Sequence, residues 1–451
     1  MGELTASFEK TILALLAERK YFALRDVLNT MASADIATLL ENIPEDKMPL
    51  LFRLLSKELA ANTFVEMDAD VQELLIRGFS DNELKDVVDE LYVDDAVDIV
   101  EEMPANVVRR ILKQADPDMR KMINEILKYP DDCAGSIMTT EYVNFSADLT
   151  VAEAIKNIRR SGVDKETIYT CYVTAPNRKL IGIITVQKLL MSDDEDEIGD
   201  IMDENAISVN TLDDKEEVAL KFSKYDLIAL PVVDRENRLV GIVTVDDAID
   251  VLQEEATEDI ERMAAITPSD KPYLKTGVFE IWRARIPWLL ILMISATFTG
   301  LIITRFESAL AAQACLAAYI PMLMDSGGNS GSQASVTVIR GLSLDEIEFR
   351  DIFRIQWKEI RVSLLCGVTL AAATFAKLML FDRVGFAVSL VVCLTLLATV
   401  VCAKFIGCTL PLISEKLGFD PAVMSSPFIT TIVDAISLLI YFFIASSVLH
   451  I

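Results

Sequence analysis

The sequence predicts a multidomain protein with an all-α N-terminal solenoid, an α/β tandem repeat and a five-helix transmembrane domain. Apolar residues recur at helical spacing through the first 130 residues, and a strand-rich pattern is duplicated between residues 135 and 252. From residue 277 onward, apolar runs reach the roughly twenty residues that span a bilayer. We therefore expect a helical N domain at 1–130, the repeat at 131–252, a connecting helix at 253–276 and the membrane domain at 277–451.

The charge of the chain is concentrated in its N-terminal part. The formal net charge is −27, yet residues 277–451 hold twelve Asp/Glu and twelve Lys/Arg, so the whole excess lies in residues 1–276. This distribution argues against nucleic acid as a partner, because phosphates would be repelled. It suits cations, and an ordinary solvated acidic surface is the alternative.

An enzyme is not expected. The single histidine is His450, and the sequence offers no nucleophile–base pair and no cofactor loop. The seven cysteines lack metal-ligand spacing, so we expect neither a zinc site nor a disulfide framework.

Residues 1–130 carry only helical patterns. Leu51, Leu54, Leu55 and Leu59 show the spacing, and breaks at prolines such as Pro44 separate the segments. We expect a stacked array of short helices, a small solenoid, whose ligand the pattern does not identify.

The repeat comprises copies at about 135–199 and 200–252. Ser136-Ile137-Met138 is echoed by Asp200-Ile201-Met202, and Gly182-Ile-Ile-Thr-Val by Gly241-Ile-Val-Thr-Val. Each copy offers a helix, two strands and a helix, and the two should pair to bury their apolar faces. The pattern resembles a tandem pair of CBS (cystathionine-β-synthase) modules, which sense ligands and change their packing.

Five apolar runs are candidate membrane spans. They are Ile286–Thr304, Ser308–Ile339, Val362–Phe381, Val384–Ile413 and Ala422–Leu449. Lysine and arginine gather before the first span, between the second and third, and between the fourth and fifth. We therefore expect a multi-pass protein of the cell inner (plasma) membrane, with a cytoplasmic N-terminus and an extracytoplasmic C-terminus.

Asp434 lies inside the fifth run. If the helix enters near Ala422, Asp434 lies roughly 18 Å into the bilayer, where a charge costs on the order of 3 kcal/mol. It must face water, a cation or a partner, and Thr430 and Thr431 extend the same polar stripe. We interpret it as a pore residue, with pairing to Lys404 as the alternative. One aspartate is too little for a divalent ion, but a two-fold dimer would supply two.

The second run contains Asp325 followed by a glycine- and amide-rich segment at 327–333. Such a segment is poor helix, so it predicts irregular backbone lining a cavity, with close helix packing as the alternative. Asn329 and Gln333 would share a face.

The connecting segment from Val245 to Ile260 is predicted to be a helix with like charges four residues apart. Glu254 faces Glu258, and Glu255 faces Asp259, which destabilises a helix by roughly 0.2–0.5 kcal/mol for each pair. Bound divalent cations would remove this cost, so the helix is a candidate metal-responsive strut. A solvated face is the alternative.

Together these features resemble the MgtE family of magnesium channels over nearly the whole chain. The most specific pieces are Gly-Gly-Asn-Ser-Gly-Ser-Gln at 327–333, the stretch from Asp420-Pro-Ala to Asp434, and Glu255-Ala-Thr-Glu-Asp259. The resemblance implies a homodimer whose Mg²⁺-selective pore, with Asp434 as its carboxylate, closes when cytosolic Mg²⁺ binds. The implied sensor ligands are Asp95 (or Asp94), Asp214, Glu216, Asp226, Asp247, Asp250, Glu255, Glu258 and Asp259.

The chain departs from the family pattern at two places. The positions at which family members bind ATP read Gln187-Lys188 and Leu227, which argues against ATP binding of that kind. Asp325 stands where the family has a small or neutral residue, and we hypothesise that it adds charge beside the pore and shifts selectivity.

The main functional hypothesis is therefore magnesium uptake gated by intracellular Mg²⁺. The alternatives are a membrane-anchored CBS regulatory or receptor protein, and a transporter of another divalent cation such as Co²⁺, Mn²⁺ or Ca²⁺.

Overall fold

The computed structural model describes residues 2–162, 165–269, 271, 273–344, 346–424 and 426–450. Residues 163–164 of the first repeat, and 270 and 272 of the connecting segment, lie outside the described residues. The chain forms two compact units, Met1–Leu252 and Gln253–Ile451, which we describe separately as the N-terminal unit and the C-terminal unit.

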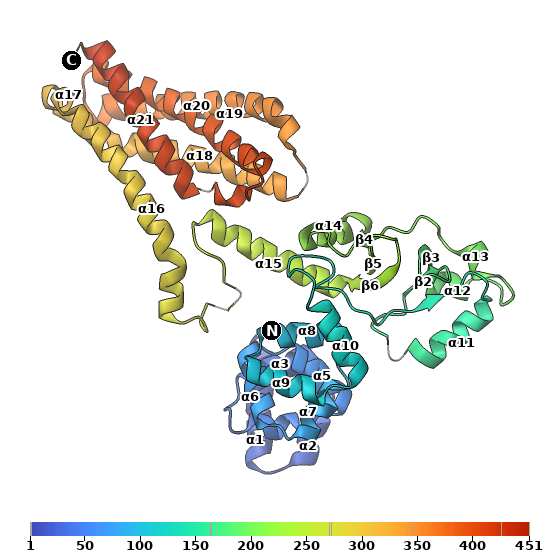
Figure 1. Ribbon diagram of the computed structural model, residues 1–451. Helices are drawn as coiled ribbons and strands as arrows, with labels where there is room; N and C mark the ends of the chain where they lie inside the picture. Colours follow the sequence, from blue (N-terminus) through green and yellow to red (C-terminus); the bar gives the residue numbers. More distant parts are fainter. Residues whose placement is uncertain are drawn as a thin grey trace. The chain divides into compact units, whose positions relative to one another are not determined.

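The N-terminal unit begins with ten helices, most of them short (Figure 1). Alternate helices pack on one another, α3 on α5, α5 on α7 and α7 on α9, and α8 packs on α10. Helices of eight to ten residues are marginal alone, so their stability comes from this stacking. The predicted solenoid is confirmed. The helices are α1 (Gly2–Ala17), α2 (Tyr21–Leu28), α3 (Ser33–Glu41), α4 (Met48–Phe52), α5 (Lys57–Val65), α6 (Ala69–Gly78), α7 (Asp81–Val88), α8 (Val93–Glu102), α9 (Ala105–Gln114) and α10 (Pro117–Ile126).

Two copies of one α/β module complete this unit. Each is a three-stranded sheet in which the first strand runs parallel to the second, and the second antiparallel to the third. The first copy contains β1 (Asn144–Phe145), α11 (Val151–Ser161), β2 (Thr170–Thr174), β3 (Leu180–Thr185) and α12 (Val186–Leu190). The second contains α13 (Ile198–Ile201), β4 (Val209–Asn210), α14 (Lys215–Tyr225), β5 (Ala229–Val233), β6 (Leu239–Thr244) and α15 (Val245–Met263), which continues into the C-terminal unit.

The repeated sequence motifs meet across the two copies. A Cβ added at Gly182 would lie 2.7 Å from Sδ of Met202, and one at Gly241 would lie 2.7 Å from Sδ of Met138. The methionine of each copy therefore packs on the glycine of the other, in a space that only glycine leaves open. This reciprocal packing explains why both motifs are duplicated, and it confirms that the copies pair.

The C-terminal unit is a bundle of long helices (Figure 1). α18, α20 and α21 pack on one another, while α19 lies on α20 and α16 lies on α21. Among the described residues, four helices are long and apolar enough to cross a membrane: those within Val278–Arg305, Phe349–Asp382, Phe386–Lys416 and Pro427–Leu449. The elements are α16 (Val278–Arg305), α17 (Glu307–Ala312), η2 (Ala314–Tyr319), α18 (Ile320–Ser343), η3 (Phe349–Asp351), α19 (Ile352–Lys377), η4 (Leu378–Asp382), α20 (Phe386–Lys416), η5 (Pro421–Val423) and α21 (Ser426–Leu449).

The second apolar run differs from its prediction. Residues 308–319 form the separate short helices α17 and η2, and α18 begins only at Ile320, with Pro321 in its first turn as helix starts favour. The glycine-rich segment is continuous α-helix, so the expectation of irregular backbone is wrong. A Cβ at Gly407 would lie 2.2 Å from the carbonyl oxygen of Gly331, so these glycines allow α18 and α20 to approach closely.

Candidate functional site

Five carboxylates from three segments gather in the N-terminal unit. Asp94, Asp95 and Asp98 come from α8, Glu166 comes from the loop between α11 and β2, and Asp247 comes from the first turn of α15. The N domain, the first repeat and the second repeat each contribute at least one. We call this set the interdomain carboxylate cluster.

Local structure explains how two segments of the cluster are held. Asp94 and Asp95 occupy the first turn of α8, where the helix dipole favours negative charge. Asp247 occupies the first turn of α15, and its carboxylate accepts a hydrogen bond from Oγ1 of Thr244 at 2.5 Å. Asp94, Asp95 and Asp247 therefore all lie at the start of a helix.

The cluster is electrostatically strained. Burial, with the nearby Asp247 carboxylate adding to it, raises the pKa of the half-buried Asp95 to about 7. Burial together with Asp95 raises the pKa of Glu166 to about 8. Asp94 is only 6% exposed, and its Oδ1, like Oε2 of Glu166, is buried without a hydrogen-bond partner. Such a group of unsatisfied carboxylates is stabilised by protons or by a cation.

The geometry sets limits on that cation. Among the described residues, no group of three or more carboxylate, histidine or cysteine side chains is arranged to ligate one metal ion directly. The carboxylates are near enough to act on one another electrostatically. This arrangement fits a cation that keeps most of its water, as Mg²⁺ does, and binds through one or two carboxylates.

Two other predicted sensor residues lie at the ends of α14, whereas Asp250 on α15 is near enough to Asp247 to raise its pKa. Asp214 caps α14, accepting a hydrogen bond from the backbone N–H of Glu216 at 2.9 Å. Asp226 ends the same helix in a left-handed conformation with φ 52°. Asp250 is exposed on α15. Of the sensor residues predicted in this unit, the structure thus brings together Asp95, with its neighbour Asp94, and Asp247.

The second half of α15 belongs to the C-terminal unit and is held there by ion pairs of the Arg262 side chain. Arg262 forms ion pairs with both Glu258 and Asp420, and Oγ of Ser343 donates a hydrogen bond to Oδ2 of Asp259 at 2.9 Å. The helix predicted from Val245 to Ile260 forms, but it ends at Met263 and does not extend to residue 276 as the expected connecting helix did. Arg262 lies four residues after Glu258, and its positive charge offsets part of the repulsion predicted between Glu254 and Glu258.

The second candidate site lies where α18 packs on α21. A Cβ at Gly328 would lie 2.8 Å from Cγ2 of Thr430, and one at Gly327 would lie 3.0 Å from side-chain atoms of Val433 and Ser437. Asp325 and Asp434 on these helices are near enough to interact electrostatically. Oδ1 of Asp434 is buried and has no hydrogen-bond partner.

Two expectations about Asp434 are corrected. α21 begins at Ser426, so Asp434 lies about 12 Å along the helix instead of 18 Å. Lys404 does not pair with it: Nζ of Lys404 lies 3.6 Å from Oε2 of Glu359, and both side chains are largely buried. The hydroxyl of Thr431 donates a hydrogen bond to the backbone carbonyl of Pro427 in the same helix, at 2.9 Å.

A polar stripe follows the outer face of α18. Asp325, Asn329 and Gln333 are four residues apart and all exposed in this single chain. Three polar side chains in a row are poorly suited to contact lipid. The stripe therefore marks a face that meets water or another polypeptide.

Sequence reasoning missed Asp98, Glu166, Arg262 and Glu359. Arg262 could have been found, because it lies four residues after Glu258 on a predicted helix. Glu166 carries no such signal, since it is one glutamate in a loop and gains its neighbours only when the domains pack.

Known proteins are similar to this chain over each of its parts. Residues 320–444 match a family described as MgtE, divalent cation transporter, residues 31–132 match the MgtE intracellular N domain, and residues 134–194 and 198–254 match the CBS domain. The chain is 36% identical to the magnesium transporter MgtE of Thermus thermophilus over 438 residues, covering 95% of each protein. It is 32% identical to the magnesium transporter MgtE of Bacillus subtilis, covering 97% of each.

Two solved structures resemble the N-terminal part. The cytosolic domain of the Mg²⁺ channel MgtE in complex with ATP superposes with a TM-score of 0.52 at 33% identity, covering 54% of this chain and 99% of that one. The soluble part of a magnesium transporter gives a TM-score of 0.53 at 31% identity, covering 56% and 99%. The similarity thus extends over the solenoid, the CBS pair and the membrane helices, and the chain belongs to the MgtE family.

Proposed function

We propose that this chain carries Mg²⁺ across the membrane along the face of α18 that bears Asp325 and Asn329, beside Asp434 on α21. The observation that carries the proposal is the exposed polar stripe of α18. Lipid would leave its amide and carboxylate groups without partners, at a cost of several kcal/mol for each group. A water-filled path removes that cost.

A second copy of the chain completes the path. Two copies related by a two-fold axis would enclose the stripe and double its charge, bringing two Asp434 and two Asp325 carboxylates to one axis. Hydroxyls, amides and carboxylates are suited to hydrogen-bonding the water shell that Mg²⁺ retains. The protein therefore acts as a homodimer within the bilayer, with its N-terminal unit in the cytoplasm.

The interdomain carboxylate cluster supports gating by the same ion. With no cation bound, repulsion between Asp95, Glu166 and Asp247 separates the N domain from the CBS pair. When cytosolic Mg²⁺ rises, the ion links these carboxylates and the unit becomes compact. α15 begins at the cluster and ends in the C-terminal unit. It transmits this change to the pore, which closes at high Mg²⁺.

ATP is not needed for this gating. Gln187, Lys188 and Leu227 occupy the positions used for ATP in the family, and they lack the family's residues there. The ATP complex named above concerns another protein. We expect equilibrium dialysis of this chain to show no ATP-dependent change in Mg²⁺ binding.

Flux into liposomes tests the proposal. Asp434→Ala should abolish Mg²⁺ entry, because it removes the only carboxylate on α21, while Asp382→Asn, at the end of η4, should leave entry unchanged. Both proteins should elute as dimers. Mg²⁺ entry at the wild-type rate through the Asp434→Ala dimer would refute the pathway and favour a membrane-anchored regulatory receptor. Faster entry of Co²⁺ or Mn²⁺ than of Mg²⁺ would change the assigned cargo.

A further inference from the structure

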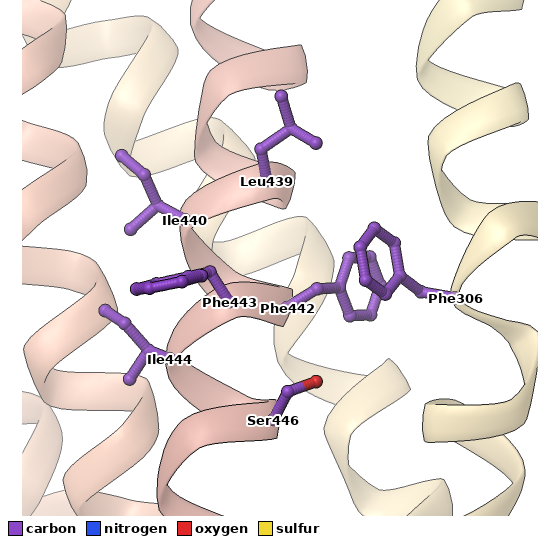
Figure 2. A pocket seen from close by; sticks show the side chains of 7 residues that line it. All are labelled: Phe306, Leu439, Ile440, Phe442, Phe443, Ile444 and Ser446. Atoms are coloured by element: carbon purple, nitrogen blue, oxygen red, sulfur yellow. The ribbon is translucent and has the colours of Figure 1, made fainter. Parts of the chain in front are cut away.

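An apolar groove runs along α21 beside Phe306, which follows α16, and it shares no lining residue with either candidate site. It has a volume of about 670 Å³ and is lined by side chains such as Leu439, Phe443 and Ser446 of α21 and Phe306 after α16 (Figure 2). The rings of Phe306 and Phe442 stack at 4.5 Å between centroids, so the groove has a rigid wall. Its polar groups are few, and Figure 2 shows the Ser446 hydroxyl beside the aromatic pair.

A smaller groove of about 290 Å³ adjoins the first and shares Phe306 and Leu439 with it. Its other lining residues are Phe298, Leu301, Ile302 and Arg305. Arg305 is the last residue of α16 and is exposed, and it forms no ion pair with any residue that the structure describes. The two grooves together thus form one apolar surface, and among their described lining residues Arg305 is the one cation.

We propose that the two adjoining grooves bind an anionic phospholipid, with an acyl chain along their apolar side chains and the phosphate on Arg305. The charge of Arg305 is complementary to a phosphate, which accepts bidentate hydrogen bonds from guanidinium. Arg305 also follows the apolar run of α16, at the depth where a membrane helix meets the headgroups. The pattern of one cation beside an aliphatic and aromatic wall therefore matches an amphipathic ligand.

The position of the groove on α21 favours lipid over a second copy of the chain. Leu439 and Phe443 follow Asp434 by five and nine residues, which places them about 140° and 180° around the helix from it. If Asp434 faces the pathway that two copies enclose, the groove faces away from it. This step rests on the proposed function, whereas Arg305 and the groove itself do not.

Native mass spectrometry of the full-length protein tests the site. We would add phosphatidylglycerol or phosphatidylethanolamine with matched chains and count the lipids retained for each protein copy. The wild type should retain phosphatidylglycerol at least about threefold more, and Arg305→Gln should lose this preference. Arg383→Gln is the matched control, because Arg383 is also exposed at the end of a membrane helix but lines neither groove. Ser446→Trp, which fills the apolar groove, should lower retention with Arg305 in place.

Two results would overturn the proposal. Equal retention by the wild type and Arg305→Gln would show that only ordinary bilayer lipid contacts this face. Efficient disulfide cross-linking of Phe443→Cys between copies, beyond that of the wild type under the same oxidation, would show that a second copy covers the groove. Neither readout measures ion flux, so failure of the lipid site and failure of the Mg²⁺ pathway are distinguishable.

Discussion

Carboxylates in the two units of this protein have opposite surroundings. In the N-terminal unit, Asp95, Glu166 and Asp247 are half-buried near one another, and burial together with neighbouring carboxylates raises the pKa of Asp95 and of Glu166. In the C-terminal unit, two carboxylates have local cationic partners: Glu359 has Lys404, and Asp420 has Arg262. The first arrangement leaves negative charge for a mobile cation to neutralise, and the second neutralises it permanently.

Asp325 and Asp434, which lie within membrane helices, differ from Glu359 and Asp420. They interact with each other, and neither forms an ion pair with any residue that the structure describes. A carboxylate inside a membrane helix persists without a protein partner only where water or a cation reaches it. The comparison therefore separates structural carboxylates from those available to ions. Three experiments test this distinction.

The largest effect is expected at the Glu359–Lys404 pair. Glu359→Gln leaves the buried Lys404 ammonium without its counter-charge, which costs about 3 kcal/mol. In a unit of this size the unfolding midpoint should fall by about 6–12 °C. The double variant Glu359→Gln/Lys404→Met should recover most of the loss, because it removes both charges. Thermal unfolding in detergent, followed by size-exclusion chromatography, measures both.

Gln356→Leu provides a neutral control between the same two helices. Nε2 of Gln356 donates a hydrogen bond to Oγ1 of Thr409 at 3.0 Å, and its loss should cost only about 1 kcal/mol. If Glu359→Gln destabilises no more than Gln356→Leu, the pair is not a structural ion pair and the contrast between the units fails.

The second effect concerns pH and the interdomain carboxylate cluster. Burial raises the pKa of Asp247 in the folded unit to about 6, that of Asp95 to about 7 and that of Glu166 to about 8, all above their ordinary values. The closed arrangement therefore binds protons more tightly than the separated one. Protonation of these carboxylates therefore stabilises the closed arrangement fully below about pH 4. This stabilisation is lost as the pH rises through the range from 6 to 8.

Limited proteolysis without divalent ions measures this dependence. Cleavage between the N domain and the CBS pair should be about tenfold slower at pH 5.5 than at pH 8.5, and millimolar Mg²⁺ at pH 8.5 should restore the protection. Glu166→Gln should weaken the pH dependence, whereas Asp226→Asn, at the end of α14, should not. Cleavage that is independent of both pH and Mg²⁺ would contradict the sensor.

The sequence predicted the parts of this protein that depend on local patterns. Helical spacing indicated the solenoid, and the duplicated Ile-Met and Gly-x-x-Thr motifs indicated two paired copies. The continuous helix through Gly327, Gly328 and Gly331 was not predicted, because its stability comes from the close approach of α20 and α21 and not from its own residues. Tertiary packing overrode the low helix propensity of glycine.

The candidate sites were predicted only in part, for a related reason. Asp434 and Asp247 were identifiable because their motifs resemble a family. Glu166 was not, because its neighbours Asp95 on α8 and Asp247 on α15 lie more than sixty residues away in sequence. The true partner of Lys404 was missed as well, since Glu359 is 45 residues earlier on α19, and only the packing of α19 on α20 brings the two together.

The smallest effect is expected at Asp325, and it tests whether this carboxylate belongs to the pathway. Mg²⁺ gives up its water reluctantly, whereas Ca²⁺ accepts direct carboxylate ligands in flexible geometries. A second carboxylate beside Asp434 therefore favours ions that dehydrate easily. Asp325→Gly should lower Ca²⁺ and Mn²⁺ entry relative to Mg²⁺ by about two- to fivefold, while Mg²⁺ entry persists. Competition assays in liposomes measure the ratio, with Asp325→Glu as the charge-preserving control. An unchanged ratio in Asp325→Gly would place Asp325 outside the ion path and leave Asp434 as its only carboxylate.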